Sequence, residues 1–306
     1  MRYITRPRAD GGACATLSGA MVLTVTLNAA LDVTYELEHV EWGEANRVGR
    51  VHARAGGKGI NVARTLQQLG REALVCGPAG GPTGDAVRAD LDTAGLPHAL
   101  SPLGGESRRT VAVVSRGHGH TTLLSEPGPE LAANEWEALH GEVAARAATV
   151  EWAVLSGSVP PGAPEDVYGI LAATCAEQGA QAVVDASGPA LVAALAARPA
   201  IVKPNARELA QALGREVDGT ADALDGAEEL RRRGARAVVV SLGEHGACAI
   251  TDEGAWHATV PRTEGNPTGA GDALVAFLVD GALRGLPWPE RLRRAARARG
   301  PSWRAV

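Results

Sequence analysis

The feature that most constrains the fold is a regular alternation of short apolar runs and helical segments between residues 152 and 241. Strands are expected at Trp152–Ser156, Ala182–Asp185, Ala200–Val202 and Ala237–Ser241, with helices near 164–178, 189–197, 206–213 and 221–233. Parallel strands need a crossover connection, so this alternation predicts a mostly parallel sheet with helices on both faces. Ligands bind beyond the carboxyl ends of such strands, where this chain carries polar residues.

The first half of the chain adds strands that do not fit a buried core. Val22–Leu27 and Ala73–Cys76 are expected as buried strands, and Gly59–Leu69 and Asp85–Ala94 as helices. The alternating runs within 35–51 (Tyr35–Val40 and Arg47–Val51) and within 108–124 are expected as exposed strands. Because the chain contains no interdomain linker, residues 21–306 are expected to form a single domain. Residues 1–20 are expected to be a disordered extension, or to precede a true start at Met21.

Composition excludes several classes of protein. The net charge is −5 and the Lys and Arg residues form no basic stripe, so nucleic acid is not the expected partner. Apolar runs stay shorter than the roughly 18 residues of a membrane span. The four cysteines form no CxxC pair, which favours free thiols in the cytoplasm. Of the 30 basic residues only Lys58 and Lys203 are lysines, which suggests that both need a compact ammonium.

The run NPTGAGDALVA, residues 266–276, predicts an anion site at the start of an apolar helix. The free N–H groups of Gly269, Ala270 and Gly271 would point outward, and the helix dipole would add positive potential. Asp272, in the first turn, could take the proton of a hydroxyl during phosphoryl transfer. An ordinary glycine-rich turn with an acidic residue near the helix start remains the alternative.

A second glycine-rich turn, AGGKGIN at 55–61, opens another expected helix. Gly57 and its neighbours would let a ligand approach the backbone, and Lys58 and Asn61 would offer a charge and an amide. The turn is not a Walker A loop, since no Ser or Thr follows the lysine. A flexible turn with a solvated lysine is the alternative.

Two further motifs follow expected strands of the parallel sheet. In KPNARE, Asn205 and Glu208 lie three residues apart, and could order water around Mg²⁺ or form a capping box. The two roles are compatible. The turn SLGEHGA could pass close to a nucleotide, although a plain hairpin is the more economical interpretation. Its candidate residues are Ser241, Gly243, Glu244 and Gly246.

These motifs, in this order and spacing, resemble those of the ribokinase-like (PfkB) carbohydrate kinases. The segments are AGGKGINVARTLQQLG, KPNARELA, SLGEHGA and NPTGAGDALVA, while VTLNAALDVTYEL, GESRRTVAVV and LSGSVPPG are similar to the hexose-phosphate branch, especially its 1-phosphofructokinases. The resemblance spans about Met21 to Leu283. It implies a three-layer α/β/α sandwich with a mostly parallel central sheet and a small β-sheet lid, which often mediates dimerisation.

The resemblance also implies a role for each candidate residue. Asp272 would be the catalytic base, and the amides of Gly269–Gly271 would form the anion hole. Asn205 and Glu208 would organise Mg²⁺–ATP, Glu208 through water, while Lys203 would meet the ATP phosphates and Ser241–Gly246 would line the nucleotide. The acceptor sugar would meet Asp32, Gly57, Lys58, Asn61 and Arg108, with Arg108 gripping the phosphate already on the sugar.

The implied activity is ATP-dependent phosphorylation of a sugar phosphate, with fructose 1-phosphate converted to fructose 1,6-bisphosphate. Tagatose 6-phosphate and fructose 6-phosphate are alternative acceptors, and Thr110 and Ser125 stand where relatives commonly place Asn near the sugar. A catalytically impaired sugar-phosphate-binding protein is a further alternative, because the end of the chain departs from the family. The run from Leu292 onward carries five arginines in thirteen residues without a clear apolar stripe. We therefore expect the chain to be truncated or frameshifted after about residue 284.

Overall fold

A large twisted sheet forms the centre of the molecule. The structure, a computed structural model, describes residues 21–117, 120–259 and 269–298. Within them the sheet has nine strands in the order β13-β12-β11-β10-β9-β8-β1-β4-β5. Strands β1 to β11 of this sheet are parallel, and β12 and β13 are antiparallel. The bounds are β1 Val22–Val25, β4 Ala73–Ala79, β5 His98–Pro102, β8 Trp152–Ser156, β9 Gln181–Asp185, β10 Ile201–Val202, β11 Val238–Ser241, β12 Ala247–Thr251 and β13 Gly254–Ala258.

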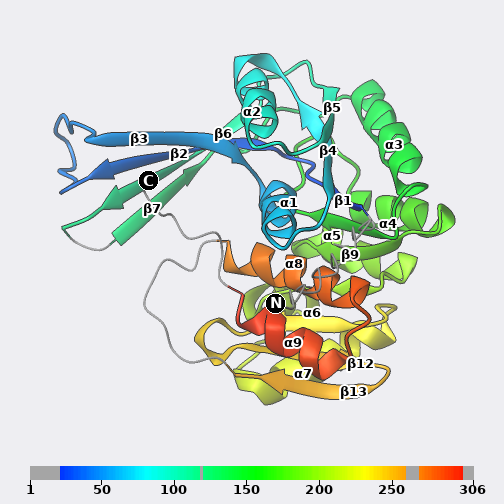
Figure 1. The fold of residues 1–306 in the computed structure, drawn as a ribbon. Helices are drawn as coiled ribbons and strands as arrows, with labels where there is room; N and C mark the ends of the chain where they lie inside the picture. The colour runs from blue at the N-terminus through cyan, green and yellow to red at the C-terminus, as the bar shows by residue number, and fades with distance from the viewer. Residues whose placement is uncertain (1–20, 118–119, 260–268, 299–306) are drawn as a thin grey trace, which may run out of the picture.

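Helices cover both faces of this sheet, which makes three layers (Figure 1). Successive residues of a strand point to opposite faces. Leu23 and Val25 of β1 accordingly join one core, while Val22 joins the other. The first core is covered by α3 Ala133–Ala147, α4 Val167–Glu177, α5 Gly188–Ala194, α6 Ala206–Leu213 and α7 Gly219–Arg232. The second is covered by α1 Lys58–Gln68, α2 Gly81–Thr93, α8 Ala270–Leu283 and α9 Trp288–Ala296. The predicted α/β/α sandwich is confirmed.

A second, smaller sheet projects from the body as a lid (Figure 1). It has the order β3-β2-β6-β7, with bounds β2 Ala30–Leu37, β3 Arg50–Gly56, β6 Arg108–Ser115 and β7 His120–Ser125. Strands β2 and β6 are parallel, and the outer pairs are antiparallel. Strand β2 thus begins five residues before the expected run Tyr35–Val40, and β3 extends five residues beyond the expected run Arg47–Val51. The reason is that Asp32 and Arg54 are charged but partly buried, which conceals the pattern.

The C-terminal helix α9 corrects one expectation. Trp288, Leu292 and Ala295 form an apolar stripe at helical spacing, and all three are buried against the second core. The run from Leu292 onward therefore does have an apolar face as far as residue 296. The stripe was missed because its first member, Trp288, precedes the arginine-rich run. The expectation of a frameshift after residue 284 is not tested by this packing, and residues 299–306 lie outside the described part.

A fully buried carboxylate, Asp280, ties α9 to α8. It lies within 2.8 Å of Arg71 Nε and of Arg284 Nε, and Arg294 Nη2 is 3.5 Å from it. Arg71 precedes β4, Arg284 ends α8 and Arg294 belongs to α9. A buried charge must be paired, so these contacts fix the C-terminal half of α8 against its neighbours.

Two further observations concern membrane spans and cysteines. In the described part of the chain, no helix is both long enough and apolar enough to cross a membrane. Cys76, Cys175 and Cys248 are free, buried thiols, and Cys14 lies outside the described residues.

Candidate active site

The candidate site lies where the ends of β9 and β10 meet the first turn of α8. The central residue is Asp185, the last residue of β9, which is completely buried. Its Oδ1 atom lies 3.2 Å from Lys58 Nζ and 3.2 Å from Lys203 Nζ, while its Oδ2 atom has no hydrogen-bond partner. Both lysines of the chain therefore converge on one carboxylate. The sequence places Asp185 among the polar residues at the ligand-binding edge of the sheet, but it assigns it no role, because a strand-ending aspartate does not reveal which charges it will meet.

Asp272 lies in the first turn of α8 and is buried. The helix begins after Gly269, whose φ of 81° is the left-handed conformation that glycine adopts readily. Burial, reinforced by the nearby negative charge of Asp185, raises the pKa of Asp272 to about 7, against the opposing effects of Asn61, Lys58 and Lys203. Asn61 Nδ2 donates a hydrogen bond to Asp272 Oδ2 at 2.9 Å. A carboxyl group with a pKa near neutrality is suited to accept a proton.

Lys203 lies beside the glycine that precedes Asp272. A Cβ atom built on Gly271 would lie 3.7 Å from Lys203 Nζ. The ammonium of Lys203 is thus adjacent to the N-terminal turn of α8, where the helix dipole is already positive. Residues 266–268 of the motif lie outside the described part of the chain. The structure places Lys203 beside Gly271, in the same turn as Asp272.

The predicted capping box at the start of α6 is present. Asn205 Oδ1 accepts a hydrogen bond from the Glu208 N–H at 2.8 Å, and Glu208 Oε2 accepts one from the Asn205 N–H at 2.9 Å. The other carboxylate oxygen, Glu208 Oε1, lies 3.6 Å from Lys58 Nζ. One oxygen of Glu208 therefore caps the helix while the other faces the site.

Lys58 lies between two parts of the site. Gly57, with a φ of 113°, ends the turn before α1, and a Cβ on it would approach Thr26 Cγ2 to 2.7 Å. Lys58 lines a hollow of about 650 Å³ together with Arg108, and its ammonium meets Asp185 and Glu208. The same hollow is lined by Thr26, Asn28, Gly57, Ser125, Glu126, Pro127, Gly157, Ser158, Val159, Pro160 and Pro161. The Asp185 and Glu208 contacts were not anticipated from the sequence.

Arg108 is held rigidly at the wall of this hollow. Its Nε donates to the Asn28 carbonyl at 3.1 Å, and its Nη1 donates to Thr110 Oγ1 at 3.1 Å and to the Glu126 carbonyl at 3.5 Å. Asn28 also donates through Nδ2 to the Pro127 carbonyl at 2.9 Å and to Ser158 Oγ at 3.2 Å. Asn28 thus joins the body, the lid and the loop after β7.

Asp32 lies on β2 between two arginines. It pairs in register with Arg54 on β3 and with Thr110 on β6. Burial raises the pKa of Asp32, and the charges of Arg54 and Arg108 oppose that rise. A Cβ on Gly56 would lie 2.0 Å from Asp32 Oδ2, so only glycine leaves space for this carboxylate. Arg54 is a residue that sequence reasoning missed.

A second hollow, of about 270 Å³, lies on the other side of Asn205. It is lined by Asn205, Ala206, Arg207, Gly219, Thr220, Ser241, Leu242, Gly243 and His245. Ser241 and Gly243 are thus lining residues of this hollow, and a β-bridge joins Asn205 to Ser241. Glu244 and Gly246 do not line this hollow. Gly246 has a structural reason to be glycine, since a Cβ there would lie 2.0 Å from the Ala258 carbonyl oxygen.

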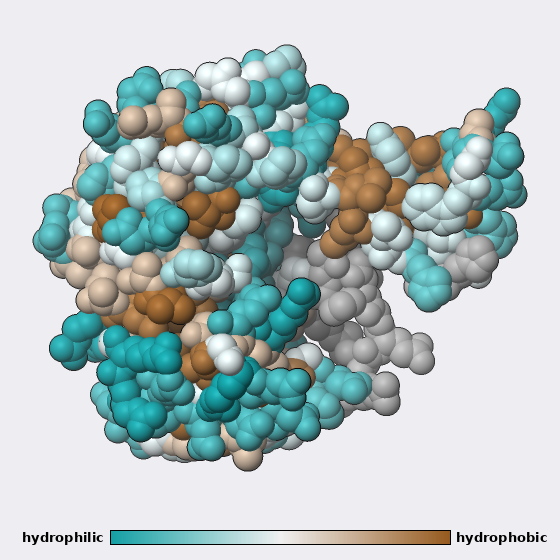
Figure 2. All heavy atoms as spheres, turned by 180° about the vertical axis from the view of Figure 1, so that it is seen from behind, coloured by the Kyte–Doolittle hydropathy of each residue, from teal (hydrophilic) through white to brown (hydrophobic). Residues whose placement is uncertain are grey.

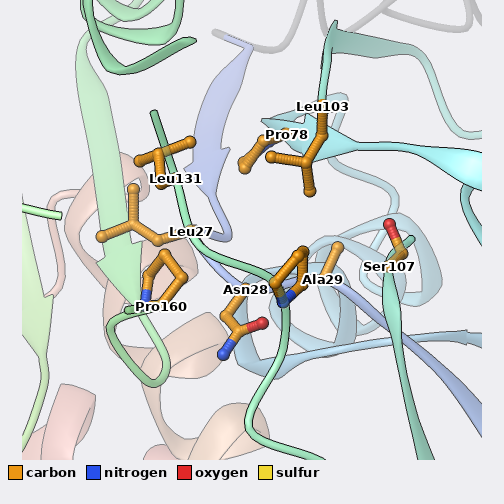
Figure 3. A pocket seen from close by; sticks show the side chains of 9 residues that line it. Leu27, Asn28, Ala29, Pro78, Leu103, Ser107, Leu131 and Pro160 are labelled. Carbon is orange, nitrogen blue, oxygen red and sulfur yellow. The ribbon is translucent and has the colours of Figure 1, made fainter. Parts of the chain in front are cut away.

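A small apolar cavity lies behind Asn28 (Figure 3). Leu27, Pro78, Leu103, Leu131 and Pro160 surround it, and its volume of about 10 Å³ has room for one water molecule. It is too small for a substrate, and it shares the lining residues Asn28 and Pro160 with the larger hollow.

Metal-binding groups are sparse. In residues 21–117, 120–259 and 269–298, no cluster of three or more His, Cys, Asp or Glu side chains could hold a metal ion. Mg²⁺ needs only one or two carboxylates, since it keeps several of its waters. Glu208 Oε1 and the unpartnered Asp185 Oδ2 fit such a water-mediated site better than a cage of protein ligands.

Comparison with known proteins identifies the family. Residues 25–298 match the family model described as pfkB family carbohydrate kinase. The tetrameric inhibited form of Escherichia coli phosphofructokinase-2 is 30% identical, with a TM-score of 0.85 over 90% of this chain and 92% of that chain. A Thermotoga maritima protein described as a possible 1-phosphofructokinase is 27% identical, with a TM-score of 0.82 over 90% and 89%.

A more distant structure supports the fold alone. Arabidopsis thaliana ribokinase, complexed with ribose and ATP, is 19% identical, with a TM-score of 0.70 over 91% of this chain and 90% of that chain. The family match and the two more similar structures point to the same family of kinases. A carboxyl group with a pKa near 7 at a glycine-rich helix start is consistent with that family. The chain belongs to the pfkB family of carbohydrate kinases, phosphotransferases that act on an alcohol acceptor.

Proposed function

We propose that this kinase transfers the γ-phosphoryl group of ATP to a hydroxyl group of fructose 1-phosphate, giving fructose 1,6-bisphosphate and ADP. The observation that carries the proposal is the placement of Arg108 by three hydrogen bonds at the wall of the larger hollow, which Lys58 also lines. A guanidinium fork held by three hydrogen bonds suits a terminal phosphate dianion. A free sugar would leave that charge unused.

In this proposal Asp272 is the general base. Its carboxylate takes the proton of the acceptor hydroxyl as the hydroxyl oxygen bonds to the γ-phosphorus and the bond to the ADP oxygen breaks. The amides of Gly269–Gly271 and the ammonium of Lys203 hold the charge of the transferred group. Asn61 orients Asp272 through its hydrogen bond, and Asp32 accepts hydrogen bonds from sugar hydroxyls beside Gly57. Catalysis then consists of positioning and charge stabilisation.

The smaller hollow, near Asn205, Ser241 and Gly243, is the proposed place of the nucleotide. Its phosphates would lie toward Lys203 and the start of α8, and Glu244 and Gly246 would support the loop rather than touch ATP. Glu208 and Asp185 would hold the waters of Mg²⁺, whose chemistry is to neutralise the charge of the phosphate oxygens.

Fructose 6-phosphate is the second candidate acceptor. Escherichia coli phosphofructokinase-2 has a structure in complex with fructose-6-phosphate, 30% identical to this chain with a TM-score of 0.84. The two acceptors differ in which end of the sugar carries the phosphate, so Arg108 would grip either. Tagatose 6-phosphate is a third candidate on the same reasoning.

We also propose that the lid mediates a homodimer. Apolar side chains gather on the lid (Figure 2), and Trp42 is 80% exposed, Val51 56%, Leu123 52% and Leu124 55%. Exposed apolar surface of this kind marks an interaction site. Sedimentation of the wild type against Leu124→Asp tests it, with a monomeric variant as the expected result.

The activity is tested by ADP release with fructose 1-phosphate, fructose 6-phosphate, tagatose 6-phosphate and ribose. We expect the highest kcat/KM with fructose 1-phosphate and the lowest with ribose. Asp272→Ala serves as the control that removes the base but leaves sugar-phosphate binding. Equal rates with ribose and the sugar phosphates would refute the role of Arg108. Sugar-phosphate binding without ADP release would identify an impaired, sugar-phosphate-binding protein instead.

A further inference from the structure

Lys58 is shared between the acceptor hollow and the carboxylates of the nucleotide side. Its stem lines the hollow beside Arg108, yet its Nζ atom is 3.2 Å from Asp185 Oδ1 and 3.6 Å from Glu208 Oε1. An acceptor-binding lysine would be expected to point its charge at the acceptor. In this structure the ammonium of Lys58 instead forms ion pairs with two carboxylates, those of Asp185 and Glu208.

Those carboxylates require a cation. Asp185 is completely buried, and an unpaired buried carboxylate is strongly destabilising. Lys203 supplies one positive charge, and in the described part of the chain its ion pair is with Asp185. Glu208 Oε2 is committed to the helix cap, which leaves Oε1 for Lys58. Lys58 is therefore the ammonium that serves both acids.

The two lysines differ in their freedom to move. The side chain of Lys203 is 3% exposed, whereas that of Lys58 is 36% exposed and borders the open hollow. Asp185 Oδ2 is buried and has no hydrogen-bond partner. This oxygen is therefore not used by either of the two ammonium groups. A divalent cation with its waters could use that oxygen and Glu208 Oε1 together.

We propose that Lys58 is an exchangeable counter-ion, which neutralises Asp185 and Glu208 until a divalent cation replaces it, and which then turns into the hollow to meet the anionic acceptor. This inference rests on the proposed function, and it adds a coupling between its two substrates. Displacing Lys58 favours binding of the acceptor, and an acceptor that holds Lys58 favours binding of the metal. By linkage the two effects are equal in size.

The coupling makes an unusual prediction for metal binding. If Lys58 competes with the metal, its removal should tighten metal binding, whereas loss of an ordinary site residue would weaken it. We would measure Mn²⁺ binding by electron paramagnetic resonance on the full chain, without nucleotide or sugar. Mn²⁺ shares the preference of Mg²⁺ for oxygen ligands.

Lys58→Met should bind Mn²⁺ on the order of tenfold more tightly than the wild type, since a unit charge within 4 Å of the site has been removed. Lys58→Arg keeps the charge and should bind as weakly as the wild type. Arg108→Met removes a charge of the same hollow that touches neither acid, and it should leave Mn²⁺ affinity unchanged. The double variant Lys58→Met/Glu208→Gln should bind Mn²⁺ no more tightly than the wild type. This result would show that the gain in affinity depends on the pair of Lys58 and Glu208.

Equal or weaker Mn²⁺ binding by Lys58→Met would overturn the proposal, as would the same gain in Arg108→Met. Lys58→Gln provides a second neutral variant should Lys58→Met fail to fold. Because the assay contains no sugar and no nucleotide, it decides the role of Lys58 independently of the acceptor. Failure of the proposed function would appear instead as absent ADP release with every sugar phosphate.

Discussion

The burial of Asp272 predicts that this carboxylate, the proposed general base, lowers the stability of the folded protein when it is ionised. The change to test is Asp272→Asn, which keeps the shape of the side chain and an oxygen that can accept the hydrogen bond from Asn61. In the folded protein the pKa of Asp272 rises from 3.8 to about 7. Each unit of pKa is worth about 1.4 kcal/mol, so ionising the buried group costs on the order of 4 kcal/mol.

The sign of the effect depends on pH. The unfolded chain releases this proton near its ordinary pKa, whereas the folded protein holds it up to about pH 7. Between those pH values the folded state binds the additional proton, so the stability of the wild type falls as pH rises and the loss is complete above pH 7. An amide does not titrate. The stability gained by Asp272→Asn should therefore be near zero at pH 4 and on the order of 4 kcal/mol at pH 8.

Urea unfolding followed by tryptophan fluorescence at both pH values measures this difference. Asp225→Asn, an exposed substitution on α7, is the matched control and should change stability little at either pH. Turnover of Asp272→Asn should fall by about 10²- to 10⁴-fold, the usual contribution of a general base. A gain that is absent at pH 8, or equal at pH 4 and pH 8, would refute the reasoning from burial.

Three other predictions follow from the site and the core. Asn61→Leu removes a hydrogen bond that lowers the pKa of Asp272, so the acid limb of the kcat/KM profile, near pH 7 in the wild type, should move to higher pH; an unmoved limb would contradict this. Arg108→Ala should raise KM for fructose 1-phosphate by about 10- to 100-fold while KM for ATP stays constant, because a charged bidentate contact is lost; steady-state kinetics would show equal effects on both if the role is wrong. Leu292→Ala should lower the free energy of unfolding by about 2–5 kcal/mol, since the side chain is 1% exposed; a loss below about 0.5 kcal/mol in urea unfolding would mean that α9 is not part of the core.

Local patterns were read correctly from the sequence. The capping box of Asn205 and Glu208 depends on residues three apart, and it forms as the spacing indicates. The start of α8 at the glycines before Asp272 is similarly local. The alternation of strands and helices predicted the sandwich, because parallel strands need crossover connections and these place helices on the faces of the sheet.

Long-range pairing could not be read in the same way. Asp185 is separated from Lys58 by 127 positions, and a strand-ending aspartate is compatible with many partners. The sequence therefore predicted Lys58 on the acceptor side and gave no sign of its carboxylate partners. Arg54 was overlooked because nothing in the sequence distinguishes it from the many other arginines. Only the register of β3 with β2 shows that it lies opposite Asp32.

The α8 helix carries two buried aspartates, Asp272 in its first turn and Asp280 two turns later. A rise of 1.5 Å per residue sets them about 12 Å apart along one rigid rod. The proposed base thus lies at one end of a helix whose other end is held by the ion pairs of Asp280 with Arg71, Arg284 and Arg294. Weakening these ion pairs should shift α8 and with it the carboxylate of Asp272, so substitutions of arginines outside the proposed site should also lower turnover.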